Sequence, residues 1–237
     1  NLSYNISYNK NKITKLADDP TSIFRWGGIT GGTGNQVLVH KTGQPYGTFY
    51  VYQQIYDAAG KPIEGAYVDQ NKDGTIDGED LRPYKKASPD VYMGLSSQFS
   101  YKNWDFNFAL RASFGNYVYN NIQSNREAFG GAWLMDPTGF LKNRVNSASY
   151  TNFSQAQFIS DYYIQNASFL RMDNISLGYT FLNPFKGLQS ARLYATVQNP
   201  FVITKYKGLD PEFNNDGIDN NIYPRPRIFM LGLSLNF

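Results

Sequence analysis

The last eleven residues of the chain, 227–237, alternate between large apolar side chains and small or polar ones. The apolar set occupies every second position and consists of Phe229, Leu231, Leu233, Leu235 and Phe237. Successive side chains of a β-strand point to opposite faces, whereas an α-helix repeats its faces every three or four residues. The segment is therefore predicted to be a β-strand with one apolar and one polar face.

The length of this strand suits a membrane crossing. At about 3.3 Å per residue it extends about 36 Å, and a tilt of about 45° gives it the height of the apolar band of an outer-membrane barrel, about 25 Å. Its ending, which includes Gly232, Leu233, Leu235 and Phe237, resembles the closing-strand signal that delivers bacterial outer-membrane barrels to their assembly machinery. The last strand of a soluble β-sandwich is the alternative that this segment alone leaves open.

The composition supports a membrane protein that crosses with strands. Aromatic residues make up 16% of the chain and charged residues only 17%, and barrels carry aromatic girdles at both membrane interfaces. No run reaches the about 18 consecutive apolar residues of a membrane-spanning helix. The net charge of +3 is spread along the chain, which argues against a nucleic-acid partner. The absence of cysteine excludes disulfides and thiol chemistry.

Eight strands are predicted in total, counting the closing one. They cover residues 2–8, 36–40, 46–55, 91–101, 104–114, 175–181, 193–197 and 227–237. Short connections near Gly43, Lys102 and Lys186 alternate with long ones near Thr21, Asp73, Gly130 and Asn214. Outer-membrane barrels have short periplasmic turns and long extracellular loops, so the C-terminus is predicted to lie in the periplasm. The chain begins inside a strand pattern without Met and is expected to be a piece of a longer polypeptide.

The two faces of these strands differ in character. An aromatic girdle is predicted at the periplasmic rim, formed by Tyr101, Trp104, Phe181 and Phe237. The predicted inward set is small and polar: Asp105, Asn107, Arg111, Ser113, Asn174, Ser176, Gly178, Thr180, Thr196, Gln198, Ser234 and Asn236. A closed barrel of about eight strands has room only for packed side chains, whereas this set suits a wide, wet lumen. The predicted fold is an all-β, antiparallel transmembrane barrel of which the chain supplies the last eight strands.

Several segments in order resemble one family. They are residues 44–50 (QPYGTFY), 69–77 (DQNKDGTID), 101–105 (YKNWD), 167–174 (ASFLRMDN), 177–179 (LGY), 198–201 (QNPF), 205–212 (KYKGLDPE) and 223–227 (YPRPR). Together they are similar to the C-terminal barrel region of the SusC-like (SusC/RagA) TonB-dependent outer-membrane transporters of Bacteroidetes. The resemblance covers nearly the whole of residues 1–237, and its most specific part is the segment that begins at Lys205.

The resemblance implies a plugged barrel of about 22 strands in the cell outer membrane. It also implies import of glycans or peptides with energy from TonB, together with a SusD-like surface lipoprotein as a lid. The plug, which would contact TonB, and the earlier strands lie outside this chain. Two alternatives stay open, a small standalone barrel with an adhesive or enzymatic role and a secreted calcium-binding β-protein.

The sequence offers little for catalysis, and no enzyme is predicted. The single histidine, His40, has no acid or nucleophile at a readable spacing. Four aromatic residues in long loops are candidates to stack on a substrate or meet the lid: Tyr117, Tyr119, Trp133 and Tyr150. Packing against neighbouring loops is the equal alternative for these rings.

An acidic loop, residues 69–80, is a candidate calcium site. Oxygen-bearing residues stand at loop positions 1, 3, 5, 7, 9 and 12, and Gly74 at position 6 allows the sharp turn of a calcium-binding loop. The predicted ligands are Asp69, Asn71, Asp73, Thr75, Asp77 and Asp80. Asp80 replaces the usual Glu, and its shorter side chain favours weaker binding or a smaller ion. A hydrated turn that binds no metal is the alternative.

Deletion of Phe237 tests the assembly signal. Its ring is one of several on the apolar face, so its removal should cost little intrinsic stability. A recognition role predicts a sharp fall in the amount of folded full-length protein in the outer membrane, measured by a heat-modifiability gel. Wild-type amounts of folded protein after the deletion would contradict the assignment.

Overall fold

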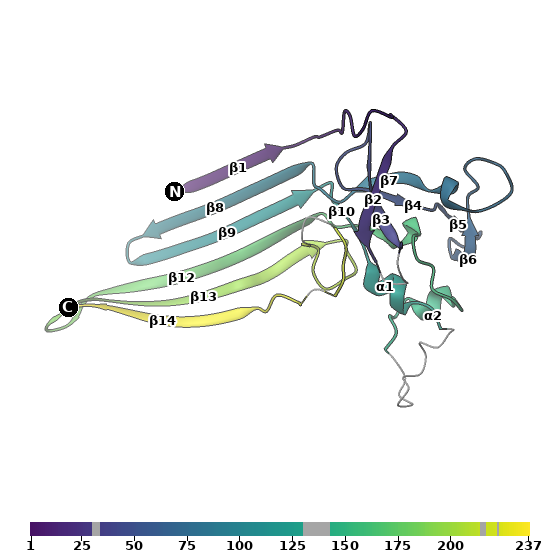
Figure 1. Ribbon diagram of the computed structural model, residues 1–237. Helices are drawn as coiled ribbons and strands as arrows, with labels where there is room; N and C mark the ends of the chain where they lie inside the picture. The colour runs from purple at the N-terminus through teal and green to yellow at the C-terminus, as the bar shows by residue number, and fades with distance from the viewer. Residues whose placement is uncertain (30–33, 130–142, 214–216, 222) are drawn as a thin grey trace.

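The computed structural model describes residues 1–29, 34–129, 143–213, 217–221 and 223–237, and its largest element is a six-stranded antiparallel sheet (Figure 1). We call it the wall sheet; its strands, in spatial order, are β1 (Leu2–Tyr8), β8 (Val91–Tyr101), β9 (Trp104–Phe114), β12 (Phe169–Phe185), β13 (Leu188–Thr204) and β14 (Ile228–Asn236). Every neighbouring pair is antiparallel. The prediction of an all-β antiparallel fold is confirmed.

The two ends of the wall sheet are different. Tight turns at Lys102–Asn103 and Lys186–Gly187 join strands at one end, which we call the turn end, and Lys102 and Gly187 take positive φ there. Both chain termini lie toward this end of the wall sheet in Figure 1. The long connections, residues 9–90, 115–168 and 205–227, all leave from the opposite end, which we call the loop end. The short turns predicted near Lys102 and Lys186 and the long connections that contain Gly130 and Asn214 therefore lie at opposite ends of the wall sheet, as predicted.

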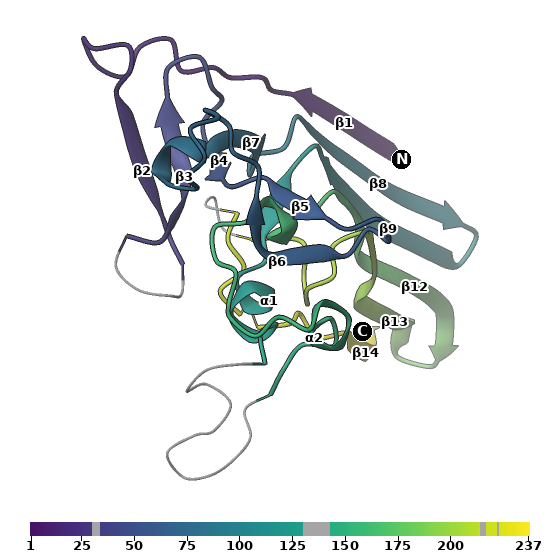
Figure 2. The same ribbon diagram turned by 90° about the vertical axis from the view of Figure 1, so that its right-hand side faces the viewer.

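The described residues of the long connections form smaller sheets and short helices at the loop end (Figure 2). A four-stranded sheet contains β2 (Ile23–Gly28), β3 (Gln36–Lys41), β4 (Thr48–Val51) and β7 (Arg82–Lys86). Two-stranded sheets pair β5 (Gln54–Tyr56) with β6 (Pro62–Tyr67) and β10 (Tyr117–Tyr119) with β11 (Ile164–Asn166). The helices are η1 (Gly78–Asp80), α1 (Asn121–Arg126), α2 (Ala148–Thr151) and η2 (Asp161–Tyr163). In the described residues, none of the helices has the length and apolar character needed to span a membrane.

The predicted count of eight wall strands is wrong at two places. The strand predicted at residues 36–40 exists as β3, and the one predicted at 46–55 is divided into β4 and the start of β5. β3 and β4 belong to the separate four-stranded sheet, and β5 belongs to a two-stranded sheet. The physical reason is burial on both faces, since all four residues of β4 are buried and Leu38 and Phe49 have no exposed surface. A barrel wall exposes one face of each strand, so these segments suit a core instead. The predicted turn near Gly43 and the loops near Thr21 and Asp73 therefore lie within the single connection 9–90.

The strand register confirms the predicted faces of the wall sheet. Asp105 lies opposite Gly178, Gly178 opposite Tyr194 and Tyr194 opposite Gly232, so these positions share the polar face. On the other face the apolar side chains are open to the surroundings, and Leu231 is 83% exposed. The predicted girdle residues lie on this apolar face near the turn end, where the Trp104 ring packs edge-on at 4.8 Å from Tyr179.

An ion pair crosses the polar face over Gly178. Arg192 on β13 donates from Nε and Nη2 to the Asp105 carboxylate on β9, at 2.8 and 2.6 Å. The pair spans the intervening strand β12, and a Cβ atom at Gly178 would lie 2.5 Å from Asp105 Oδ2 and 2.7 Å from Arg192 Nη2. Gly178 therefore makes room for an interaction that ties three strands together.

Substitution of Gly178 tests this arrangement. Gly178→Val should push Asp105 and Arg192 apart and lower the free energy of unfolding by about 1–3 kcal/mol, as overpacking does elsewhere. Thermal unfolding of the purified full-length protein, followed by circular dichroism, measures the change. Gly28→Val is the matched control, because a Cβ atom there meets no atom within 4 Å. Equal stability of the two variants would show that the Gly178 position is not crowded.

Candidate functional site

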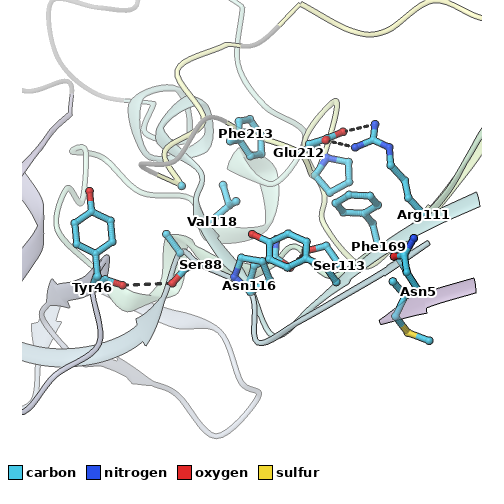
Figure 3. A pocket seen from close by; sticks show the side chains of 17 residues that line it. Asn5, Tyr46, Ser88, Arg111, Ser113, Asn116, Val118, Phe169, Glu212 and Phe213 are labelled. Carbon is cyan, nitrogen blue, oxygen red and sulfur yellow. Dashed lines mark hydrogen bonds and ion pairs between the residues drawn. The ribbon is translucent and has the colours of Figure 1, made fainter. Parts of the chain in front are cut away.

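A cavity of about 450 Å³ opens between the polar face of the wall sheet and the segments at the loop end (Figure 3). The residues that line it include Tyr46, Arg111, Ser113, Asn116, Phe169 and Glu212. They come from connection 9–90, from β9 and the turn after it, from the start of β12 and from the segment before β14. The wall and three sequence-distant loop segments therefore meet at one place.

Uncharged hydrogen-bonding groups and aromatic rings make up much of the cavity lining. Ser113 Oγ donates to Asn116 Oδ1 at 3.3 Å, and Asn116 Nδ2 donates to the Ala167 carbonyl at 3.0 Å. Tyr46 is 44% exposed and lies at the edge of the cavity, where its carbonyl accepts from Ser88 Oγ at 3.4 Å and its ring packs 5.0 Å from His40. Amides and hydroxyls beside aromatic faces suit a polar ligand that is held by hydrogen bonds and ring contacts.

The charged side chains of the cavity are paired with one another. Arg111 Nε donates to both carboxylate oxygens of Asp173, at 2.8 and 2.9 Å, and its Nη1 and Nη2 atoms donate to Glu212, the latter at 2.9 Å. Asp173 reaches this position because β12 shifts register between Met172 and Asn174 relative to both neighbouring strands. A bulge of this kind leaves one residue outside the ladder and re-aims its side chain.

A further ion pair, close to Arg111 and Glu212, is buried. Arg171 Nη2 donates to Asp210 Oδ1 at 2.6 Å, with side chains only 3% and 4% exposed. Arg225 Nη1 lies 2.7 Å from Glu212 Oε2, and its Nε lies 3.5 Å from Asp210 Oδ2. We call the whole set the arginine cluster; it consists of Arg111, Arg171, Arg225, Asp173, Asp210 and Glu212. Its three positive and three negative charges balance.

Two groups outside the wall have shifted pKa values with clear causes. Burial raises the pKa of the Tyr206 hydroxyl, and its 2.5 Å hydrogen bond to Asp219 Oδ2 acts in the same direction. Burial also raises the pKa of Asp161, although hydrogen bonds from the Gln54 amide at 3.0 Å and from Arg82 at 2.8 Å oppose the shift. Both groups are held by local contacts and lie outside the cavity lining.

The acidic loop is closed by hydrogen bonds to its own backbone. Asp69 accepts from the Lys72 amide at 2.5 Å and from the Gly74 amide at 2.9 Å, so position 1 contacts the glycine at position 6. Further along, Asn71 accepts from the Asp73 amide at 3.2 Å. Asp73 in turn accepts from the Thr75 amide at 2.7 Å. The sharp turn that the sequence predicts is therefore formed.

Asp80, at the end of this loop, binds back to its start. Its buried carboxylate accepts from the backbone amides of Gln70 at 2.7 Å and Asp77 at 2.8 Å. The amides of Asp77 and Gln70 lower the pKa of Asp80, because they stabilise its charged form. In the described residues, no three acidic or histidine side chains converge on one point as they do in a formed metal site. Calcium binding stays a prediction.

The aromatic candidates lie in different environments. Tyr119 has no exposed surface and packs edge-on with Tyr163 at 6.1 Å in the main core cluster, so the predicted ligand contact is wrong for Tyr119. Tyr117 is partly buried beneath Lys85 Nζ, 5.1 Å from the ring centre. Tyr150 on α2 is 53% exposed, so its ring is accessible to another molecule. Trp133 lies outside the described residues.

The proposed assembly residues lie on both faces of the chain end, in β14 and at the residue after it. Leu233, Leu235 and Phe237 lie on the apolar face, with exposed fractions of 62%, 46% and 78%. Gly232 lies on the polar face, where a Cβ atom would stand 2.2 Å from Tyr194 Cζ. The Tyr194 ring therefore covers the glycine and fills the gap on its face. Recognition of this strand by assembly machinery stays a prediction.

The arginine cluster is the part of the site that the sequence did not reveal. Its members stand at positions 111, 171, 173, 210, 212 and 225, and only the folded sheet brings them together. A signal was present, because the segment that begins at Lys205 is the most specific of the family-like motifs. No spacing rule, however, connects that segment to β9 or to a bulge in β12.

Comparison with known proteins gives a consistent answer. No protein-family model matches the sequence. TonB-dependent receptor SusC of Bacteroides thetaiotaomicron is 49% identical over the whole chain, which covers 24% of that protein. TonB-dependent receptor P3 of Formosa agariphila is 29% identical over 99% of the chain, which covers 26% of it. The RagAB peptide transporter structure superposes over the whole chain with a TM-score of 0.75 at 24% identity, and the chain covers 27% of it.

The wall sheet and these matches define the chain as part of a TonB-dependent receptor. Within that class the chain corresponds to a segment of the SusC-like transporters, as its identity to SusC shows. The chain spans about a quarter of the length of the relatives that it matches. The names of these relatives are those of receptors and transporters, in agreement with the prediction that the protein is not an enzyme.

Proposed function

We propose that residues 1–237 form the C-terminal part of the barrel of an outer-membrane transporter that imports glycans or peptides with energy from TonB. The 49% identity to SusC over the whole chain carries this proposal. The division of the wall sheet into an open apolar face and a small polar face supports it, because a barrel wall needs lipid outside and water inside.

The two edge strands of the wall sheet are consistent with a barrel that contains more strands than this chain supplies. Among the residues that the structure describes, β1 and β14 each pair with one neighbour, so each has one free edge. Backbone groups at such an edge cannot stay unpaired in a lipid bilayer, and only a closed barrel satisfies them. Further strands of the same polypeptide, about 22 in all, would close the wall around a plug that contacts TonB.

The loop end is the proposed meeting place for substrate and a SusD-like lipoprotein. The structural relative is named as a peptide transporter, and the curated relative as SusC. In the same orientation the turn end faces the periplasm, where the strand that ends at Phe237 would meet the barrel assembly machinery. The cavity next to Tyr46 then lies on the substrate side of the wall, and Tyr150 is the exposed aromatic candidate for contact with the lipoprotein.

Uptake measurements test the proposal. Cells that lack the full-length gene should lose import of either an oligosaccharide or an oligopeptide mixture, and cells without TonB should show the same loss. Tyr46→Ala should raise the half-saturating concentration about two- to tenfold, because one aromatic contact is removed. Tyr223→Ala is the control, since Tyr223 is 89% exposed and does not line the cavity.

Unchanged uptake of both mixtures after gene deletion would refute the transporter assignment. Release of the full-length protein from membranes without detergent would instead favour a secreted β-protein. A full-length gene no longer than this chain would favour the small standalone barrel. Each alternative therefore has its own observable result.

The acidic loop is proposed to bind Ca²⁺ and so stiffen connection 9–90 at the loop end. The loop already has the sharp turn at Gly74, and calcium prefers six to eight oxygen ligands of the kind that Asp69, Asn71, Asp73 and Asp77 supply. Binding requires these oxygens to turn inward together.

Elemental analysis and titration calorimetry should detect calcium in the wild-type protein and less in Asp69→Asn/Asp73→Asn. Asp57→Asn, in a neighbouring turn, is the control; equal calcium in all three proteins would contradict the site.

A further inference from the structure

The segment between β13 and β14 runs back over the polar face of the wall sheet at the loop end. We call its described residues, 205–213, 217–221 and 223–227, the return segment (Figure 1). Pro211, Glu212 and Phe213 of this segment line the cavity. Figure 3 shows Glu212 bound to Arg111 there. The position of the return segment therefore determines the shape of one side of the cavity.

The arginine cluster joins the return segment to the wall. Arg111 on β9 and Arg171 on β12 belong to the wall, and they bind Glu212 and Asp210 of the return segment. Arg225, from the other end of the return segment, binds Glu212 at 2.7 Å and so closes the segment on itself. Asp210 Oδ1 also accepts from the Glu212 amide at 2.9 Å, which fixes the two acidic residues relative to each other.

Burial makes the loss of either partner of this ion pair costly. The Arg171 and Asp210 side chains are almost completely buried, and an unpaired charge left at such a depth is strongly unfavourable. The segment could leave the wall only by separating these charges. Local opening of the return segment is therefore opposed by the same ion pairs that shape the cavity.

Hydrogen bonds away from the cluster hold the rest of the return segment. The Tyr206 hydroxyl donates to Asp219 at 2.5 Å within the segment, and the Asp219 amide donates to the Tyr119 carbonyl at 2.9 Å. Lys207 N donates to Gln165 Oε1 at 3.1 Å, which connects the segment to β11. The return segment is therefore attached to its neighbours by backbone hydrogen bonds as well as by the arginine cluster.

We propose that the arginine cluster is a clamp that keeps the return segment fixed against the wall, as a permanent side of the cavity. Arg111 and Arg171 are then positioning residues, because they act on a ligand through Glu212 and its neighbours. A ligand meets a preformed surface at Pro211 and Phe213 instead of a loop that must first become ordered. The structural proposal stands alone; its effect on ligand binding rests on the proposed transport function.

Limited proteolysis of the purified full-length protein tests the clamp. Lys205 and Lys207 are exposed and offer trypsin sites within the return segment. Asp210→Asn leaves the buried Arg171 without its charged partner and should accelerate cleavage after Lys205 or Lys207 about tenfold or more. Heat-modifiability of the barrel should stay unchanged, because the opening is local. Asp18→Asn is the control, since the Lys15–Asp18 pair is exposed on both sides and should leave cleavage unchanged.

A second variant keeps the test decisive if Asp210→Asn does not assemble. Glu212→Gln removes the partner shared by Arg111 and Arg225 at a partly exposed position and should also accelerate cleavage. Higher salt should speed cleavage of the wild-type segment more than that of Glu212→Gln, because salt screens ion pairs and leaves apolar packing intact. Wild-type cleavage rates in both variants, or equal salt effects, would overturn the clamp.

Uptake assays separate the clamp from the transport function. Glu212→Gln should raise the half-saturating concentration of the imported mixture, while the maximal rate per folded transporter stays the same. An unchanged half-saturating concentration would overturn the positioning role. If the wild-type protein imports neither mixture, the proposed function fails, and the cleavage rates still decide whether the clamp exists.

Discussion

Antiparallel hydrogen bonding between β9 and β12 fixes the register on which the remaining structure depends. Side chains alternate between faces along a strand, so a slip by one residue would move every apolar side chain to the polar face. The observed register places Asp105 opposite Gly178 and Arg111 opposite Arg171. The cross-strand ion pair, the cavity lining and the arginine cluster all follow from this pairing.

The polar face shows how a protein places charges without leaving them unpaired. Near the turn end, Asp105 and Arg192 neutralise each other across a glycine. Near the loop end, the bulge at Asp173 adds an acidic side chain beside Arg111, and the return segment supplies Asp210 and Glu212 for Arg171 and Arg225. The face therefore offers mainly neutral hydrogen-bonding groups to a ligand, although it contains many ionisable residues.

Strand periodicity made the wall predictable and left the loop end obscure. The strict alternation at Phe229–Phe237 and in the hairpin at Lys102 identified wall strands and their faces, because a period of two needs no knowledge of distant residues. Residues 36–55 lack that alternation, since β4 is buried on both faces. The ligand contact proposed for Tyr119 failed for a related reason: a tyrosine in a long connection looks exposed until the long connections prove to share a core. The arginine cluster depends on contacts between residues far apart in sequence.

The internal core of connection 9–90 has a consequence for the order of folding. β1 pairs with β8 across this whole connection, with Tyr8 opposite Val91, and closing a long flexible loop carries an entropic cost. Val39, Tyr50 and Leu81 all lie within this connection and share a buried cluster, so the connection can become compact early. Compaction brings the ends at Asn9 and Asp90 together, where the Asn9 amide donates to the Asp90 carbonyl at 2.9 Å. The folded connection then holds the ends of β1 and β8 close together, so that their pairing no longer requires closure of a long flexible loop.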